Sequence, residues 1–165
     1  GEIYVRGDNV TPGYMNNPEA TAEIMDGDWL RTGDLGFLKN GHLWITGRIK
    51  SLIVSAAGKN IYPEELEDKL LEYMTILEVV VFGRKKDGKQ GEEIRALVVP
   101  DMEQLGPNFY IDDVPDKGKI REAVKTVIDK VNSQVAPYKR ISAFDVQLEE
   151  LEKTSTKKVK RFLYK

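Results

Sequence analysis

The chain has 165 residues, of which 41% are hydrophobic and 32% are charged, an ordinary composition for a globular protein. Its 25 basic and 27 acidic residues give a formal net charge of -2, which excludes the net basic field of a general nucleic-acid-binding surface. The sequence has no cysteine, which excludes a disulfide scaffold, a cysteine zinc site and a thiol nucleophile.

The ends of the sequence and its apolar runs bear on location. No run of about 18 apolar residues could span a bilayer, and no charged-then-apolar leader opens the chain. Residues 1–5 already have a strand-like pattern, so we expect a piece of a longer protein. We expect a cytoplasmic location because the absence of cysteine suits a reducing compartment, and peripheral contact with a membrane stays open.

The first 49 residues are rich in turns and short strands. Asn17 and Pro18 are typical of the cap and first position of a short helix. His42, the only histidine, is predicted to face solvent on a hairpin strand. Alternating apolar residues and Gly-Asp or Asn-Gly turns predict strands at residues 2–6, 28–36 and 42–46.

Beyond Lys50 the pattern changes to alternating strands and helices, which predicts an α+β fold with a small mixed sheet flanked by helices. Helices are expected at residues 63–74 and around residues 120–135. Residues 78–83 are continuously apolar, and we expect them at the centre of the sheet. The further elements expected are strands at 52–54, 93–99 and 141–146, a charged turn at 85–91 and a surface excursion at 100–117.

The sequence between these two parts, residues 47–67, reads as a joint. It contains a fixed cation at Arg48, a short basic link, an apolar β-prone run, a turn with Gly58, and a helix start near Pro63 with acids in its first turn. Residues 29–34 form a Trp-Leu-Arg-Thr-Gly-Asp segment upstream. Residues 152–161 form a basic tail downstream, which composition alone would assign to solvent-exposed charge.

These three segments, in this order, resemble the motifs of the adenylate-forming enzymes, which include acyl-CoA synthetases, firefly luciferase and the adenylation domains of peptide synthetases. The resemblance covers nearly the whole chain. It implies that residues 1–49 are the β-rich end of the large N-terminal AMP-binding domain, and that residues 50–165 are the C-terminal mobile lid domain.

The resemblance also implies roles for individual residues. Asp34 would accept hydrogen bonds from the ribose hydroxyls of ATP, a task that suits a carboxylate because it has two acceptor oxygens. Arg48 would contact the nucleotide, Lys50 would be the hinge, and Gly58 would lie beside the thiol of CoA.

The tail resembles the closing motif of the family, Pro-x-Thr-x-x-Gly-Lys-x-x-Arg, in which the lysine catalyses adenylation. Aligning Thr154 and Arg161 with that motif places the lysine at Lys158. The sequence departs from the motif at Glu152, where proline is usual, and at Lys157, where glycine is usual. Lys157 therefore remains the alternative catalytic lysine.

The implied function is an AMP-forming acyl-CoA ligase that uses ATP and CoA, with Mg²⁺ ligands outside this chain and the missing N-terminal domain as partner. Long-chain acyl-CoA synthetases also lack the glycine of the closing motif, and they share a junction like residues 55–61, so a fatty acid is the expected substrate. We expect the isolated chain to be inactive. Two alternatives stay open: an adenylation domain that loads a carrier protein, and a non-catalytic α/β interaction module.

Overall fold

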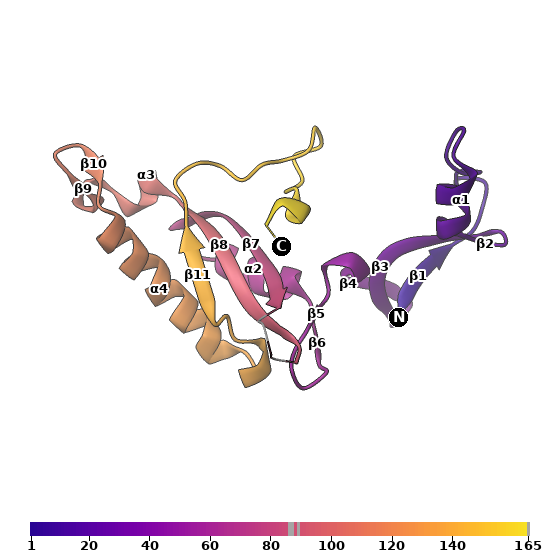
Figure 1. Ribbon diagram of the computed structural model, residues 1–165, viewed down its shortest axis with the longest axis horizontal. Helices are drawn as coiled ribbons and strands as arrows, with labels where there is room; N and C mark the ends of the chain where they lie inside the picture. The colour runs from indigo at the N-terminus through magenta and orange to yellow at the C-terminus, as the bar shows by residue number, and fades with distance from the viewer. Residues whose placement is uncertain (86–87, 89, 165) are drawn as a thin grey trace. The chain divides into compact units, whose positions relative to one another are not determined.

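The computed structural model describes residues 1–85, 88 and 90–164 and divides the chain into two compact units (Figure 1). We call Gly1–Lys50 the N-terminal unit and Ser51–Lys165 the C-terminal unit. Each unit has its own sheet. Residues 86, 87 and 89 of the charged turn predicted at residues 85–91 lie outside the described residues.

The N-terminal unit is a small antiparallel sheet with one short helix, α1 (Pro18–Ile24). The helix begins as the sequence predicts, because Pro18 is at its first turn and the Asn17 side chain accepts a hydrogen bond from the Ala20 N–H at 3.0 Å. The central strand, β3, pairs with the three other strands of the unit. The strands are β1 (Glu2–Val5), β2 (Met25–Asp26), β3 (Trp29–Lys39) and β4 (His42–Arg48).

The β3–β4 hairpin exposes an apolar surface. Asn40 and Gly41 join the strands with φ of 52° and 76°, the positive values that a tight hairpin turn favours. The hairpin places Phe37 opposite Trp44, with the rings stacked at 6.5 Å between centroids. Both side chains are at least half exposed, and all buried hydrophobic residues that the structure describes lie at Ile53 or beyond. The N-terminal unit therefore has an apolar face but no hydrophobic core of its own.

The C-terminal unit contains a mixed three-stranded sheet in the order β11-β8-β7. Strand β7 (Ile76–Lys85) runs antiparallel to β8 (Glu92–Pro100), and β11 (Ala143–Val146) runs parallel to β8. Two short hairpins complete the strands: β5 (Ile53–Val54) with β6 (Asn60–Ile61), and β9 (Tyr110–Ile111) with β10 (Val114–Pro115). Together with the flanking helices, this sheet confirms the predicted α+β class.

Helices α2 (Pro63–Leu71) and α4 (Lys117–Gln134) flank the sheet, and α3 (Met102–Leu105) is a single short turn (Figure 1). The apolar stripe of α4 is buried as predicted. Helix α2 ends at Leu71, before the end at residue 74 that the sequence predicts, and Met74 is 74% exposed. The difference arises because the Ile76 N–H bonds the Tyr73 carbonyl in a turn that leads directly into β7. Four short 3-10 turns lie at Ile49–Ser51, Pro107–Phe109, Pro137–Lys139 and Arg161–Leu163.

The two faces of this sheet are covered differently. One face packs against α2 and α4 in a core that includes Val81, Leu66 and Val124. On the other face Val80 and Val99 pack with Leu151 and with side chains of the chain's last segment. We call residues 147–164 the C-terminal tail. Because the tail covers the second face, it is part of the folded unit.

Strand β7 is at the edge of the sheet, which corrects the prediction that residues 78–83 lie at its centre. The middle strand is β8. The continuous apolar run in β7 reflects burial on both faces of the strand, by helices on one side and by the tail on the other. Burial of both faces and a central place in the sheet produce the same sequence pattern, so the pattern alone could not separate them.

Candidate functional site

Asp34 and Arg48 form an ion pair in the N-terminal unit. They lie opposite each other in the register of β3 and β4, and Arg48 Nε is 2.8 Å from Asp34 Oδ1. The Asp34 side chain is 27% exposed and that of Arg48 is 61% exposed. Among the described residues none donates to the second carboxylate oxygen of Asp34, so that oxygen can accept a hydrogen bond from a ligand.

The backbone before Asp34 is tied to β1. Thr32 Oγ1 donates to the Ile3 carbonyl at 2.8 Å and accepts the Asp34 N–H at 3.1 Å. Gly33 has φ of +71°, a left-handed conformation that favours glycine, and its N–H donates to a carboxylate oxygen of Glu2 at 3.3 Å. These hydrogen bonds therefore fix the backbone that carries the Asp34 side chain.

A hollow of about 710 Å³ lies beside this segment, within the N-terminal unit. Its cationic lining comes from Arg31, Arg48 and Lys50, and its acidic lining from Glu2 and Glu23. Lys50 belongs to the 3-10 turn Ile49–Ser51 and is the last residue of the unit. The hollow thus brings two of the predicted residues, Arg48 and Lys50, to one surface.

Gly58 lies in the turn that joins β5 to β6. Its φ is +70°, and a Cβ built on it would meet nothing within 4 Å. The Gly58 N–H donates to the Ser55 carbonyl at 2.9 Å. Because this position needs a left-handed backbone and faces open space, glycine leaves an accessible surface there that no side chain blocks.

The turn with Gly58 rests on the start of β8. The Val54 N–H donates to Glu92 Oε2 at 2.9 Å. A Cβ at Gly91, whose φ is +81°, would come within 2.3 Å of the Ala56 nitrogen. Gly91 therefore permits the close approach of the two segments, a role that the sequence did not suggest.

Lys158 is exposed on a small loop of the tail. Lys153 and Val159 pair as an antiparallel bridge, and the Thr154 N–H donates to the Lys158 carbonyl at 2.8 Å. The Lys158 N–H donates to Thr154 Oγ1 at 3.2 Å. We call residues 153–159 the lysine loop. Its hydrogen bonds define the backbone on which the Lys158 amine is presented.

Lys157 is left-handed, with φ of +60°. A non-glycine residue rarely adopts this conformation, whereas glycine adopts it without a steric penalty. The position therefore has the backbone that a glycine would favour, and it directly precedes Lys158. In the alignment with the closing motif, which stays a prediction, Lys157 occupies the place of the glycine and Lys158 that of the lysine.

The structure also shows an ion pair that the sequence analysis did not assign. Arg161 donates to both carboxylate oxygens of Glu67, and the Glu67 side chain is only 9% exposed. Burial raises the pKa of the Glu67 carboxyl, and Arg161 and the Val81 N–H oppose that shift. The available signal was a charged residue at position 67, between Leu66 and Leu70 on the buried face of α2.

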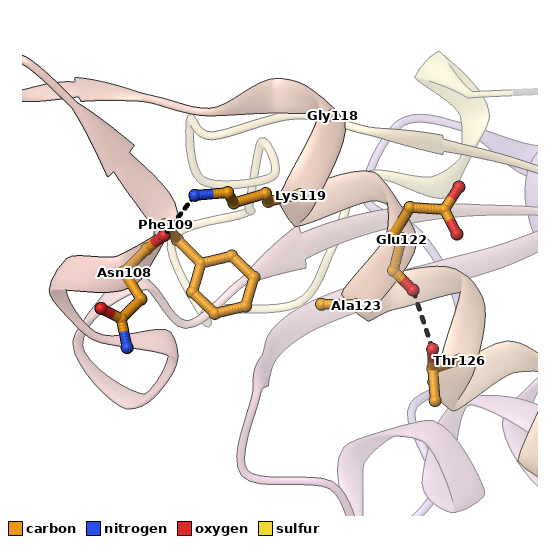
Figure 2. Close-up of a pocket in the computed structure, with 7 residues that line it drawn as sticks. All are labelled: Asn108, Phe109, Gly118, Lys119, Glu122, Ala123 and Thr126. Atoms are coloured by element: carbon orange, nitrogen blue, oxygen red, sulfur yellow. Dashed lines mark hydrogen bonds between the residues drawn. The ribbon is translucent and has the colours of Figure 1, made fainter.

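A second hollow, of about 630 Å³, lies against the first turns of α4 (Figure 2). Figure 2 shows Phe109 facing Ala123 across it, and Lys119 Nζ donating to the Asn108 carbonyl at 3.1 Å. It contains none of the predicted site residues. The Lys119 ammonium at its edge is already bonded to a backbone oxygen.

Within residues 1–85, 88 and 90–164, no three His, Cys, Asp or Glu side chains gather as metal ligands would. Within the same residues, no helix is long and apolar enough to cross a membrane.

Comparison with known families decides the identity of the C-terminal unit. The model of the AMP-binding enzyme C-terminal domain matches residues 65–158, which is more than half of the chain. The chain belongs to the AMP-binding enzyme C-terminal domain family. It corresponds to the C-terminal portion of an adenylate-forming enzyme, as the motif resemblance predicted, and its fold is that of the family's C-terminal lid domain.

Curated relatives that match this chain include CoA ligases. It is 35% identical over 166 aligned positions to a long-chain-fatty-acid–CoA ligase of Bacillus subtilis, covering 98% of the chain and 26% of that protein. It is 48% identical over 101 residues to an indoleacetate–CoA ligase of Aromatoleum aromaticum, covering 61% of the chain and 19% of that protein. The matches therefore cover only 19% to 26% of the length of these relatives.

A solved structure gives the same result over the whole chain. An o-succinylbenzoate CoA synthetase from Bacillus subtilis, in complex with its acyl-adenylate intermediate, is 30% identical with a TM-score of 0.78. The match covers 100% of this chain and 30% of that one. Both units of the chain thus have counterparts in this solved structure.

Proposed function

We propose that this chain is the C-terminal part of an AMP-forming acyl-CoA ligase. In this proposal residues 1–49 are the end of the large AMP-binding domain and residues 50–165 are its mobile lid. The observation that carries the proposal is the lysine loop: within a unit that belongs to the family, the left-handed residue Lys157 directly precedes an exposed lysine, Lys158.

The proposed reaction has two steps. The carboxylate of the acid attacks the α-phosphate of ATP, which forms acyl-AMP and releases pyrophosphate. The thiol of CoA then attacks the acyl carbonyl, which forms the thioester and releases AMP. The ammonium group of Lys158 would lie against the carboxylate and the α-phosphate in the first step and stabilise the negative charge that gathers there.

Asp34 and Arg48 are the proposed nucleotide-binding residues. Asp34 keeps one oxygen on Arg48 Nε and has a second oxygen available for ribose hydroxyls. The guanidinium of Arg48 is 61% exposed, so it can meet a ligand while it orients the carboxylate. Mg²⁺, which we expect to be bound by residues outside this chain, would supply charge neutralisation at the phosphates.

The second step requires a different surface at the reacting centre. We propose that the lid turns about Lys50, removing Lys158 and bringing Gly58 to the path of the CoA thiol. The open space around Gly58 supports this role, because a glycine there leaves room for the pantetheine arm. The short 3-10 turn Ile49–Ser51 supports a hinge at Lys50, because it is the segment that joins the two units.

A long-chain fatty acid is the proposed substrate. The match to the long-chain-fatty-acid–CoA ligase covers 98% of the chain, whereas the match to the indoleacetate–CoA ligase covers 61%. Neither match reaches an acyl-binding pocket, because the chain spans only a small share of both proteins. The preference therefore rests on similarity across the N-terminal unit, the hinge and the lid together.

We propose that the chain alone is inactive. Its N-terminal unit has an exposed apolar hairpin face with Phe37 and Trp44 and no buried core, which supports a place at the end of a larger domain that covers this face. The proposed partner is therefore the remainder of the AMP-binding domain, and the proposed location of the enzyme is the cytoplasm.

The acceptor of the acyl group is the remaining alternative. An adenylation domain that loads a carrier protein presents the same pantetheine thiol to the site, so the surface around Gly58 suits both acceptors. CoA is favoured here because the relatives that match the chain are CoA ligases. A non-catalytic interaction module is disfavoured, since it would not require the Asp34–Arg48 pair and the lysine loop in one chain.

The test uses the complete enzyme that carries this chain. We expect ATP–pyrophosphate exchange that depends on a long-chain fatty acid, and thioester formation with CoA. Indoleacetate and succinylbenzoate serve as competing acids, and a pantetheinylated carrier protein serves as the competing acceptor. Pyrophosphate exchange that depends on an aromatic acid would contradict the fatty-acid substrate. Transfer to the carrier protein alone would contradict CoA as the acceptor.

A further inference from the structure

Two charged side chains form hydrogen bonds with the backbone of one residue, Val81, on the outer edge of β7. The Val81 N–H donates to Glu67 Oε1 at 2.6 Å, and the Val81 carbonyl accepts from Arg161 Nη1 at 3.3 Å. An edge strand otherwise presents such groups unpaired. Glu67 comes from α2 and Arg161 from the C-terminal tail, so three segments meet at this point.

Glu67 and Arg161 also bind each other at two points. Arg161 Nη1 lies 2.6 Å from Glu67 Oε1, and Arg161 Nη2 donates to Glu67 Oε2. The side chains are 9% and 26% exposed. A planar guanidinium held on both oxygens of a carboxylate has one orientation, which a lysine with a single ammonium could not reproduce. The pair therefore fixes both the place and the direction of the tail at Arg161.

The lysine loop lies between this pair and a second anchor. At its start Lys153 forms an ion pair with Glu78 of β7, and the preceding Leu151 N–H donates to Glu78 Oε2 at 2.7 Å. At its end Val159 packs on the sheet, two residues before Arg161. The exposed loop is thus held at both ends on the same strand.

Apolar contacts alone would hold the tail less specifically. Val159 and Tyr164 pack against the face with Val80 and Val99. Burial of apolar surface is non-directional, so it does not by itself select one register of the tail. The contacts of Arg161 with Glu67 and the Val81 carbonyl select one register of the tail along β7. A shift of about 1 Å in a catalytic group can cost a factor of about 100 in rate.

We propose that Glu67 is a positioning residue for the adenylation step, which acts by holding Arg161 and thereby the lysine loop with Lys158. The inference rests on the proposed function. Glu67 touches no substrate in this account. Its effect is confined to the step that uses Lys158, because the thioester step uses the surface around Gly58.

The chain offers a matched control on the same helix. Glu65 of α2 binds Lys139 Nζ with its two oxygens at 2.9 and 2.6 Å, and Lys139 belongs to the 3-10 turn Pro137–Lys139, outside the tail. Glu65→Gln removes a comparable carboxylate from α2 without changing the anchor of the lysine loop. It therefore separates loss of lysine positioning from general weakening of the helix.

The first experiment compares Glu67→Gln, Arg161→Lys and Glu65→Gln in the complete enzyme. We expect the first two to lower the kcat of ATP–pyrophosphate exchange by about 10- to 100-fold. Thioester formation from preformed acyl-AMP should stay at the wild-type rate in all three, and Glu65→Gln should change neither step. Arg161→Lys carries the test if Glu67→Gln fails to fold.

The second experiment needs no activity and uses the 165-residue chain itself. Hydrogen exchange at the amides of Thr154 and Lys158, which are bonded within the loop, should accelerate in Glu67→Gln and stay unchanged in Glu65→Gln. Equal loss of both half-reactions, the same loss in Glu65→Gln, or unaltered hydrogen exchange in the lysine loop would overturn the proposal. Absence of ATP–pyrophosphate exchange in the wild-type enzyme would instead refute the proposed function.

Discussion

Asp34 and Arg48 face each other across the β3–β4 hairpin, with Arg48 Nε 2.8 Å from Asp34 Oδ1. The pair is fixed by strand register, and both side chains remain accessible to solvent. A surface pair of this kind contributes little to stability, typically below about 1 kcal/mol. The ligand-binding role proposed for the pair is therefore tested by its effect on the nucleotide and not by its effect on stability.

Asp34→Asn tests this assignment. The amide keeps the size of the side chain but loses the charge and one acceptor oxygen. Because hydrogen bonds to charged groups contribute about 1.5–3 kcal/mol, we expect the KM for ATP in the complete enzyme to rise by about 10- to 100-fold. Asp28→Asn, an exposed acid of the same unit, is the control. An unchanged KM for ATP would remove Asp34 from the nucleotide site.

Gly58→Leu tests the thiol path. The left-handed backbone costs a non-glycine residue about 1 kcal/mol, and the side chain would enter open space, so the lid should still fold. We expect adenylation to persist and thioester formation to stop, measured as pyrophosphate exchange and as product from preformed acyl-AMP. Gly88→Leu, at another open left-handed glycine with φ of +73°, is the control. Equal loss of both half-reactions in Gly58→Leu would contradict the assignment.

Glu67 predicts a pH dependence of stability. Burial raises its pKa above the ordinary value of 4.5, so the folded chain holds this proton more tightly than the unfolded chain. The stability that protonated Glu67 contributes is fully present below the pKa of this carboxyl in the unfolded chain. It is lost as the pH rises through the higher pKa of the folded chain. The Tm of the wild type minus the Tm of Glu67→Gln, followed by thermal unfolding, should therefore fall as the pH rises from about 4 to 7. A rise of this Tm difference with pH would contradict a raised pKa of Glu67 in the folded chain.

Lys157→Gly separates the two adjacent lysines. Glycine relieves the left-handed strain at φ of +60° but loses more entropy on folding, so we expect stability to change by less than about 1 kcal/mol. Adenylation should continue at the wild-type rate, because the variant restores the glycine of the closing motif and leaves Lys158 in place. Loss of pyrophosphate exchange in a folded Lys157→Gly enzyme would make Lys157 the catalyst.

The local elements of the fold could be predicted where one interaction decides them. The Asn17 cap, the Asn40–Gly41 turn and the stripe on α4 each follow from neighbouring residues, and the structure confirms them. The place of β7 could not be predicted, because burial by a tail some 70 residues later gives the same apolar run as a central position. The position of β7 depends on contacts between residues far apart in the sequence, which a local pattern does not reveal.

The candidate site shows the same division. The motifs gave Asp34 and Arg48, and strand register brings them together. The anchor of the lysine loop could not be read in the same way, because Glu67 and Arg161 are 94 residues apart and neither belongs to a local pattern that names its partner. Only the charge on the buried face of α2 indicated that a partner was required.

The most direct test of the account is Lys158→Ala in the complete enzyme, with acyl-dependent ATP–pyrophosphate exchange compared with thioester formation from preformed acyl-AMP. Removing a cation placed to stabilise the transition state should lower exchange by about 100- to 1000-fold and leave the second step intact. That result would support Lys158 as the adenylation lysine and the C-terminal unit as the mobile lid. Survival of both steps would contradict the account and assign the tail to exposed charge.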